Sequence, residues 1–328
     1  MMLSRVAESL YWMQRYRERA ENVSRLIEAS LHLNIDAPGD DQAQWFPVVA
    51  TTGDHELFEK LYGSAAEKKV LHFLTFDERN SNSILNCLLK SRENARSIRP
   101  IITSEMWNEL NSIHVYVQKI AATAKEHRTG SDFYDRIRKS CQLFTGIMDT
   151  TLSHNEAWHF GRLGNLIERA DQTSRILDVK YFILLPTPEY VGTAFDDIQW
   201  TALLKSVGAL EMYRRVRHSV RHNHVVEFLI LNCEFPRSIH SCLLRAEQSL
   251  YRILSGETRQ CTSYQRVSSL CKNLSSITID EIIKEGLHEF LDRIQSRIIE
   301  INTSIYDDFF ALTSALPVMA ETLTVPES

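Results

Sequence analysis

Hydrophobic positions recur every three or four residues over long stretches of this chain, which is the spacing of an α-helix. The pattern first runs from Leu3 to His32 and ends in the polar segment 34–41, which contains Pro and Gly. Further helices are predicted at 45–62, 66–76, 80–99, 103–127, 132–152, 155–184, 196–217, 221–231, 236–254, 263–272 and 279–315. Strands are not convincingly signalled anywhere. The sequence therefore predicts an all-α, multi-helix bundle.

Several expected helix starts carry a capping box, in which a Ser or Thr accepts from the third helical N–H and a Glu three residues later reaches back. The candidate pairs are Ser64 with Glu67, Ser153 with Glu156, and Thr278 with Glu281. Breaks are expected at 186–193, where two prolines stop a helix, and at 255–263. Neither is long enough for a flexible linker, so we predict one domain over residues 1–316 and a frayed tail over 317–328.

One stretch of nine residues occurs in two nearly identical versions. Residues 18–26 read ERAENVSRL and residues 168–176 read ERADQTSRI, with five of the nine positions identical. On a helix, each copy places five side chains along one stripe. The first stripe is Tyr11, Arg15, Glu18, Asn22 and Arg25, and the second is Gly161, Asn165, Glu168, Gln172 and Arg175.

The second copy lies on a helix that is apolar on nearly every side and should therefore be central. An unpaired charge inside the protein is costly, so Glu168 and Arg175 are expected to find partners of opposite sign on a neighbouring helix. The first helix offers Glu18, Arg19 and Arg25. We predict a pseudo-repeated pair of long central helices whose acids and arginines interlock in a polar seam.

The alternative is that each stripe is a solvated helix face. Glu21 stands four residues before Arg25, and Asp171 four before Arg175, which is the favourable direction for a pair within one helix. Two weaker fragments extend the pattern: Arg-Ala-Glu-Gln at 245–248 repeats the motif core, and SRENARS at 91–97 is a similar cluster out of register. Together they suggest that several helices contribute to one polar centre, with duplication as its origin.

Composition narrows the class of protein. The chain has 328 residues, 44% hydrophobic and 24% charged, which is ordinary for a soluble globular protein. A net charge of −5 argues against a general nucleic-acid binder, because neutralising phosphates needs a basic face. The six cysteines form no CxxC pair, the N-terminus has no signal-type apolar run, and no window approaches a membrane span. We expect a cytoplasmic protein with reduced thiols that binds neither nucleic acid nor membrane.

The sequence contains few motifs for metal binding, cofactor binding or catalysis. His218 and His222 could share a metal on one helical face, but Arg214, Arg217 and Arg221 would repel a cation, so no metal is expected. The same run is either a basic patch or a solvated helix end. No phosphate loop, nucleophile elbow or HExxH motif appears, so we expect no cofactor and no ATPase activity in this chain alone, and no catalytic residue can be named. Aromatic residues beside the charged motifs are candidates for a pocket floor or for core packing: Tyr11, Trp12, Trp107 and Trp158.

Four segments together resemble the bacterial Alpha-E family. They read MLSRVAESLYWMQRYRERAENVSRL, SRENARSIRPIITSEMWNELN, NEAWHFGRLGNLIERADQTSRILDVKY and EFPRSIHSCLLRAEQSL, and run from Met2 to about Leu250. The family is named for its helical fold and Glu-Arg motif. The resemblance implies as partners a circularly permuted ATP-grasp protein and often a transglutaminase-like peptidase, in systems that make or modify peptides by forming amide bonds.

The resemblance also carries over candidate binding residues. They are Glu18, Arg19, Glu21, Asn22, Arg92, Glu93, Asn94, Arg96, Glu105, Trp107, Trp158, Glu168, Arg169, Asp171, Arg175 and Arg237, with Asp178 and Pro236 also matching. The stripe adds Arg15 and Arg25. The chain departs from the family at Gln14, where glycine is usual, at Arg17, where an apolar residue is usual, and at His154-Asn155, where Arg-Asp is common. These departures put local helix packing and the edge of any pocket in question.

Three functions are compatible with these observations. In the first, the chain is an accessory protein that docks on an ATP-grasp ligase and holds its peptide or amino-acid substrate, because arginines suit carboxylates and carboxylates suit amines. In the second, it is an enzyme for amide transfer or hydrolysis that uses Glu18 or Glu168, with a pKa raised by burial, as general acid or base. In the third, the ion pairs are purely architectural.

Overall fold

The computed structural model describes residues 2–36, 41–123, 130–184 and 194–311, and every regular element among them is helical. The predicted all-α fold is confirmed. The first half of the chain contributes α1 (Ser4–Asp36), α2 (Asp41–Thr52), α3 (His55–Tyr62), α4 (Glu67–Thr75), α5 (Ile84–Ser97), α6 (Ser104–Thr123) and α7 (Ser131–Thr151). The second half contributes α8 (Glu156–Leu184), α9 (Ala194–Ser206), α10 (Leu210–Val216), α11 (His222–Leu231), α12 (Ile239–Ile253), α13 (Thr262–Ser276), α14 (Ile279–Glu285) and α15 (Leu287–Ile305), followed by a π-helical turn at Tyr306–Phe310.

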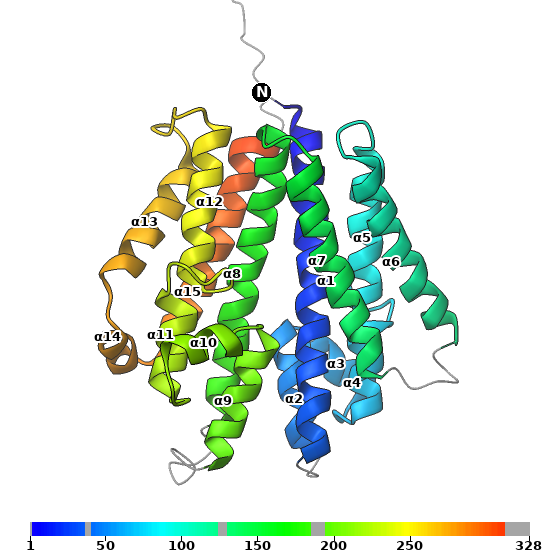
Figure 1. Cartoon of the computed structure of the whole chain (residues 1–328), viewed down its shortest axis with the longest axis vertical. Helices are drawn as coiled ribbons and strands as arrows, with labels where there is room; N and C mark the ends of the chain where they lie inside the picture. The colour runs from blue at the N-terminus through cyan, green and yellow to red at the C-terminus, as the bar shows by residue number, and fades with distance from the viewer. Residues whose placement is uncertain (1, 37–40, 124–129, 185–193, 312–328) are drawn as a thin grey trace, which may run out of the picture.

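The two longest helices, α1 and α8, lie side by side at the centre of the bundle (Figure 1). Helices α5 and α7 pack on α1, and α12 and α15 pack on α8, with α6 and α13 outside them. Helices α2 and α9 each contact both central helices near one end of the molecule. Most positions of α1 between Ala7 and Ile27, and of α8 between Phe160 and Leu177, are buried, so charged side chains on both helices lie inside the protein.

Three predicted helices are each two helices in the structure, and the break is a glycine in every case. Gly53, Gly208 and Gly286 have φ angles of 78°, 65° and 107°, which side chains with a Cβ rarely adopt. Apolar residues continue in helical spacing across each glycine, and for this reason periodicity alone joined the pieces 45–62, 196–217 and 279–315.

Of the three predicted capping boxes, one is confirmed. Thr278 accepts from the Glu281 N–H, and the Glu281 carboxylate accepts from the Thr278 N–H, at the start of α14. The other two are wrong, because α4 begins after Ala66 and α8 is capped by Asn155, whose Oδ1 accepts from the Ala157 N–H. The predicted domain end at 316, the tail 317–328 and the break at 186–193 lie outside the described residues. Within the described part, no helix is both long enough and apolar enough to cross a lipid bilayer.

Candidate functional site

Glu168 of α8 is fully buried and is held by two arginines of α1. Arg15 donates from Nε to Oε2 at 2.9 Å, and Arg19 donates from Nε to Oε1 at 2.6 Å and from Nη2 to Oε2 at 3.0 Å. Gln172, one turn along α8, donates to Oε1 at 3.2 Å. The carboxylate therefore has a charged partner on each oxygen.

Glu18 of α1 is equally buried and is held from the opposite side. Arg169 of α8 donates from Nε to Oε1 at 2.8 Å and from Nη2 to Oε2 at 2.9 Å. Asn165 donates to Oε2 at 2.6 Å, and Arg237, which precedes α12, donates from Nη1 to Oε1 at 3.0 Å. We call Arg15, Glu18, Arg19, Glu168, Arg169 and Arg237 the polar seam.

The contacts of the polar seam are reciprocal. The glutamate of each Glu-Arg pair accepts from the arginine of the other pair, Glu18 from Arg169 and Glu168 from Arg19. The predicted interlocking of acids and arginines is confirmed, and the solvated-face alternative is wrong for these four residues. That the two stretches arose by duplication stays a prediction.

Neither glutamate is poised as a general acid. Burial raises the pKa of Glu168, but the nearby Arg19 and Arg15 guanidinium groups outweigh burial and hold the pKa below its ordinary value. For Glu18, burial likewise raises the pKa, and Arg169 and Arg237 together hold it well below its ordinary value. The expectation of a carboxyl group with a raised pKa is wrong, because each carboxylate faces at least two guanidinium groups. Both stay ionised at neutral pH.

A second pair of acids continues the seam one turn further along. Glu21 accepts from Arg25 Nη2 at 2.9 Å and from Arg237 Nη2, and Asp171 accepts from Arg175 Nε at 2.9 Å through Oδ2. The predicted pairs within each helix are confirmed. The expected partner for Arg175 on another helix is not found among the described residues, because Arg175 lies against the Gly53 backbone, where its side chain remains 27% exposed.

At the other end of the seam, aromatic rings surround Arg15. Its guanidinium carbon lies 5.0 Å from the Trp12 ring centroid and 5.7 Å from that of Tyr11. Asn302 of α15 accepts from both Arg15 and the Tyr11 hydroxyl. These rings pack against a seam arginine, and neither lines the two cavities described below.

Two of the residues that depart from the family pattern, Gln14 and Arg17, contact each other. Arg17 is 1% exposed and donates to Gln14 Oε1 at 2.7 Å, to Glu18 Oε2 at 3.1 Å and to the Cys141 carbonyl at 3.0 Å. Gln14 therefore supplies a buried acceptor for the Arg17 guanidinium. Asn155 caps α8, and His154 stacks on Trp158 with ring centroids 4.1 Å apart.

Other sequence-predicted residues lie away from the seam. On α5, Arg92 pairs with Glu93 and Asn111, Arg96 pairs with Glu93, and Asn94 donates to its own helix. This cluster faces α6, where Arg92 lies over the Trp107 ring. The idea that it joins a single polar centre is wrong, because its register turns these side chains away from α1.

The fragment at 245–248 is also peripheral. Arg245 donates to the Glu234 carbonyl, and Gln248 is exposed. Glu105 is exposed on α6, and Trp158 packs under Arg162 at 4.9 Å. His218 precedes α11 while His222 begins it, so the two do not share a helical face. Among the described residues, no group of three or more His, Cys, Asp or Glu side chains is placed to hold a metal ion.

A cavity of about 270 Å³ opens beside the polar seam, between α1, α8 and the loops that follow α2 and precede α5. Its charged and amide side chains come from Arg19, Asp54, Asn82, Asp171, Gln172 and Arg175. Asp171 is 7% exposed, and its Oδ1 atom is buried without a hydrogen-bond partner in the described protein. Asn82 bridges the lining, since it accepts from Arg19 Nη1 at 2.6 Å and donates to Asp54 at 3.0 Å.

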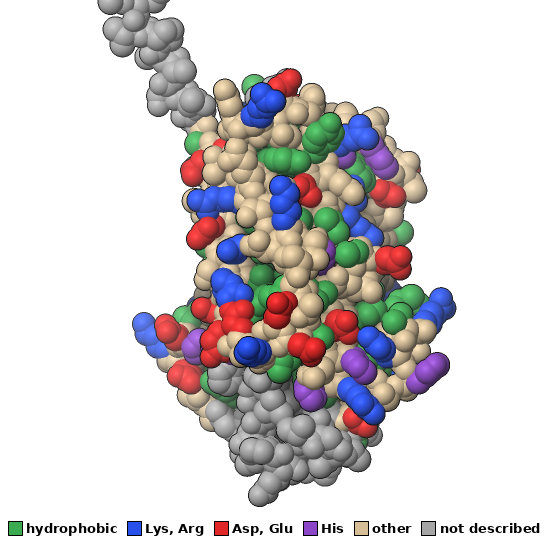
Figure 2. Space-filling view, turned by 90° about the vertical axis from the view of Figure 1, so that its left-hand side faces the viewer, with side chains coloured by type: hydrophobic (Ala, Val, Ile, Leu, Met, Phe, Trp, Pro, Cys, Tyr) green, Lys and Arg blue, Asp and Glu red, His purple; other side chains and the backbone are tan. Residues whose placement is uncertain are grey.

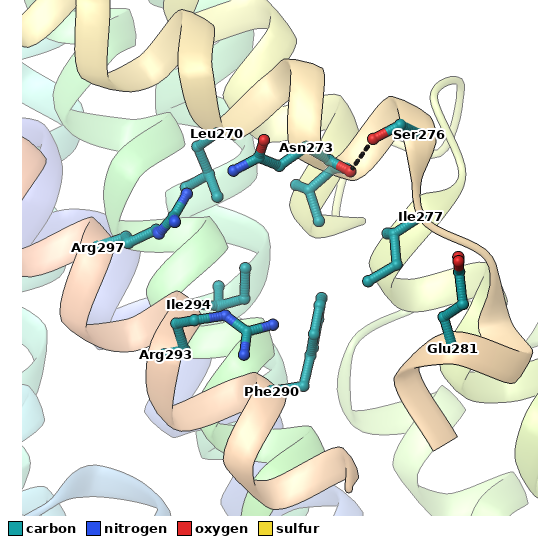
Figure 3. Close-up of a pocket in the computed structure, with 10 residues that line it drawn as sticks. Leu270, Asn273, Ser276, Ile277, Glu281, Phe290, Arg293, Ile294 and Arg297 are labelled. Atoms are coloured by element: carbon teal, nitrogen blue, oxygen red, sulfur yellow. Dashed lines mark hydrogen bonds between the residues drawn. The ribbon is translucent and has the colours of Figure 1, made fainter. Parts of the chain in front are cut away.

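A larger cavity of about 430 Å³ lies elsewhere, between α13, α14 and α15 (Figure 3). Apolar side chains such as Leu270, Ile277 and Phe290 line it, with arginines on one side. Two of its charged groups already have partners, because Arg293 pairs with Glu285 and Glu281 closes the capping box. On the face formed by this side of the bundle, acidic and basic side chains are interspersed, with small hydrophobic areas between them (Figure 2).

Among the charged and amide residues that line the smaller cavity, sequence reasoning did not single out Asp54 and Asn82. Gln172 was a member of the second stripe but not a candidate binding residue. Asp54 and Asn82 belong to loops, where no periodic pattern exists to single them out. Arg237 was found through the family resemblance alone, and the structure brings it into the seam.

Comparison with known proteins identifies the family of this chain. Residues 2–310 match the model of Alpha-E, described as a predicted α-helical domain with a conserved ER motif, and the chain belongs to this family. Curated relatives include the uncharacterized proteins Mb2597 of Mycobacterium bovis and Rv2567 of Mycobacterium tuberculosis, each 21% identical over 347 residues. The match covers 98% of this chain but only 38% of each relative. No solved structure matches the chain.

Proposed function

We propose that this Alpha-E protein holds an amino-acid or peptide substrate for an ATP-grasp-type ligase that forms amide bonds, and that the substrate binds in the cavity beside the polar seam. The observation that carries the proposal is the cavity itself, which joins charges of both signs to a buried acceptor without a partner. A zwitterionic ligand presents both an anion and a cation, so it matches such a lining.

The structure around the cavity suits a holding role. The lining side chains come from long central helices and from loops pinned to them, and Arg19 is itself held by Glu168. Groups that already sit in fixed ion pairs lose little further freedom when a ligand binds. The cavity volume of about 270 Å³ suits a single residue or a peptide end.

Holding is a better match than catalysis by this chain alone. The two seam glutamates stay ionised, which removes the general acids that an independent amide-transfer enzyme would use. The chemical step is therefore assigned to a partner that binds ATP. The family resemblance suggests a circularly permuted ATP-grasp protein, and a transglutaminase-like peptidase as a further partner.

The longer relatives support a module that works beside other domains. More than half of each relative lies outside the matched region. In these relatives, the matched region is therefore part of a longer polypeptide. Joining two modules in one polypeptide raises the effective concentration of each near the other. The proposal includes a cytoplasmic location, which the six unpaired cysteine thiols support.

The proposal is tested by titrating the purified chain calorimetrically with the circularly permuted ATP-grasp protein that the family resemblance implies as its partner, and by measuring ATP turnover of that protein with candidate amino acids. We expect association with a dissociation constant of about tens of micromolar or tighter, and turnover that rises when the chain is present. Arg175→Ala should reduce the gain in turnover, while Arg266→Ala, on an exposed pair far from the cavity, should not. Absence of both association and stimulation would overturn the proposal.

A further inference from the structure

Two loop glycines occupy matching places on the two sides of the polar seam. Gly53 follows α2 and Gly208 follows α9, and both have positive φ angles. A Cβ on Gly53 would lie 3.1 Å from Nη1 of Arg175, and a Cβ on Gly208 would lie 3.1 Å from Nη1 of Arg25. Each glycine thus supports the arginine that ends one stripe.

The loops before α5 and α12 also match. Asn82 and Arg237 each precede an N-cap serine, Ser83 and Ser238, whose side chain accepts from the backbone N–H three residues on. The helices that follow read SILNCLL and SIHSCLL. Asn82 and Arg237 both reach the central helices, the first at Arg19 and the second at Glu18.

The two sides of the seam differ in what lies beside the acid that follows each Glu-Arg pair, which is Glu21 on α1 and Asp171 on α8. We call the α1 side, where Arg237 occupies this space, the filled side. On one side, the Arg237 guanidinium donates to Glu18, to Asn22 Oδ1 at 2.9 Å and to Glu21. On the other side, Asn82 bonds to Arg19 and Asp54 and makes no hydrogen bond to the corresponding acid, Asp171. The cavity lies there, and the Oδ1 atom of Asp171 stays buried without a donor.

Charge balance leaves room for one more cation at the cavity. On the filled side, the carboxylates of Glu18 and Glu21 contact four guanidinium groups, those of Arg17, Arg25, Arg169 and Arg237. Around the cavity, the three carboxylates of Glu168, Asp171 and Asp54 face three guanidinium groups, those of Arg15, Arg19 and Arg175. A buried carboxylate oxygen without a donor is costly, and a charged donor relieves that cost most.

We propose that the cavity is a subsite for the guanidinium group of an arginine-type ligand, and that Arg237 is a built-in copy of that ligand on the opposite side of the seam. On binding, the Asp171 side chain turns so that its buried Oδ1 atom accepts from the ligand guanidinium together with the amide oxygen of Gln172, as Glu21 and Asn22 accept from Arg237. Asp54 also lines the cavity, and Arg175, whose side chain is 27% exposed, is available to a ligand carboxylate. This subsite rests on the proposed function for the role of its ligand, which is then an arginine or an arginine-containing peptide.

The experiment uses the full chain and isothermal titration with L-arginine, with a capped peptide containing one arginine, and with L-citrulline, in which a neutral urea group replaces the guanidinium. We expect L-arginine or the peptide to bind at least about tenfold more tightly than citrulline, because the buried carboxylate recognises charge. The two arms distinguish a free amino acid from a peptide as the ligand. Equal binding of citrulline, binding of inorganic phosphate in place of the cation, or no binding of any guanidinium probe overturns the proposal.

Two variants at the cavity and one control variant keep the test specific. Asp171→Asn should lower arginine affinity by about tenfold or more, whereas Asp149→Asn, on the exposed face of α7, should leave it unchanged. Asn82→Arg places a guanidinium where Arg237 stands on the other side, so it should abolish arginine binding and raise the melting temperature. An Asn82→Arg protein that still binds arginine contradicts the subsite. These probes need no partner protein, so arginine binding without ligase association would refute the proposed function alone, and the reverse would refute the subsite alone.

Discussion

Gly164 of α8 lies directly against the backbone of Tyr11 on α1. A Cβ at residue 164 would stand 2.2 Å from the Tyr11 carbonyl oxygen and 2.9 Å from its carbonyl carbon. Because the obstacle is backbone, no side chain can move aside. This contact sets the separation at which the seam arginines reach the glutamates of the other helix.

Gly164→Ala should therefore destabilise the protein by about 3 kcal/mol or more, since the helices must separate and stretch the buried ion pairs. Urea unfolding measures the loss. Gly146→Ala, in the exposed part of α7 where nothing lies within 4 Å of the added Cβ, is the matched control. It should stabilise the protein slightly, by about 0.5 kcal/mol, because alanine favours a helix. Equal effects of the two substitutions would contradict the close approach.

Glu168→Gln should reduce the free energy of unfolding by about 3–5 kcal/mol, because Arg15 and Arg19 would keep buried charges without a carboxylate. Glu300→Gln breaks the exposed pair with Arg266 and should cost at most about 1 kcal/mol. Both are measured by chemical denaturation. A Glu168→Gln protein with unchanged stability but no activity in the ligase assay would instead support a catalytic role for this residue.

Acid should weaken the fold through the same carboxylate. Burial raises the pKa of Glu168, but Arg19 and Arg15 hold it at about 2, below the ordinary 4.5. A group whose pKa is lowered by folding stabilises the protein above its unfolded pKa, and this contribution disappears as the pH falls through the folded value. Unfolding free energies measured between pH 4.5 and pH 2 should decline steadily. The Glu168→Gln variant should show a shallower decline over this range.

Arg17→Met should be tolerated, although Arg17 is among the most buried side chains. Glu18 keeps Arg169 and Arg237, and Glu21 keeps Arg25 and Arg237, so no carboxylate loses its last partner. We expect stability within about 1 kcal/mol of the unmodified protein, or a gain. Arg169→Met removes the two-point contact with Glu18 and should cost about 3 kcal/mol or more. If Arg17→Met is the more damaging change, the order of importance inferred from these contacts is wrong.

Arg237→Ala should leave an empty space beside Glu18 and Glu21 on the filled side of the seam. Glu18 and Glu21 then lose a shared guanidinium, and we expect a loss of about 2–4 kcal/mol. Added methylguanidinium at millimolar concentration should restore part of the melting temperature, and methylammonium should restore less, because only the planar group can contact both carboxylates. Failure of methylguanidinium to restore any stability would show that Arg237 acts mainly through its own loop.

The sequence was most informative where a physical pattern is repeated. The stripe around Glu168 is charged on a helix that is otherwise apolar, and burial of such a stripe demands partners, so the pairing with Arg19 could be predicted. The cluster at 91–97 shares the residue types but not the register, and it faces α6. The residue types of this cluster, without the matching register, were not enough to predict where its side chains lie.

Loop residues and helix breaks were not predictable in the same way. Asp54 and Asn82 reach the cavity from loops, whose path depends on how α2 and α5 pack on the central helices. The breaks at Gly53, Gly208 and Gly286 interrupt runs whose apolar spacing continues unchanged. That Asp171 keeps an oxygen without a donor while Glu21 is paired with Arg237 can be seen only in the folded arrangement.

The reciprocal ion pairs make each half of the polypeptide an electrostatic counterpart of the other. A chain cut between α7 and α8 would produce two fragments, one in which Glu18 has lost Arg169 and Arg237, and one in which Glu168 has lost Arg15 and Arg19. Neither fragment should fold by itself, yet the two together should reassemble, as in a split reporter. Recovery of the native helical signal on mixing would then follow the product of the two fragment concentrations.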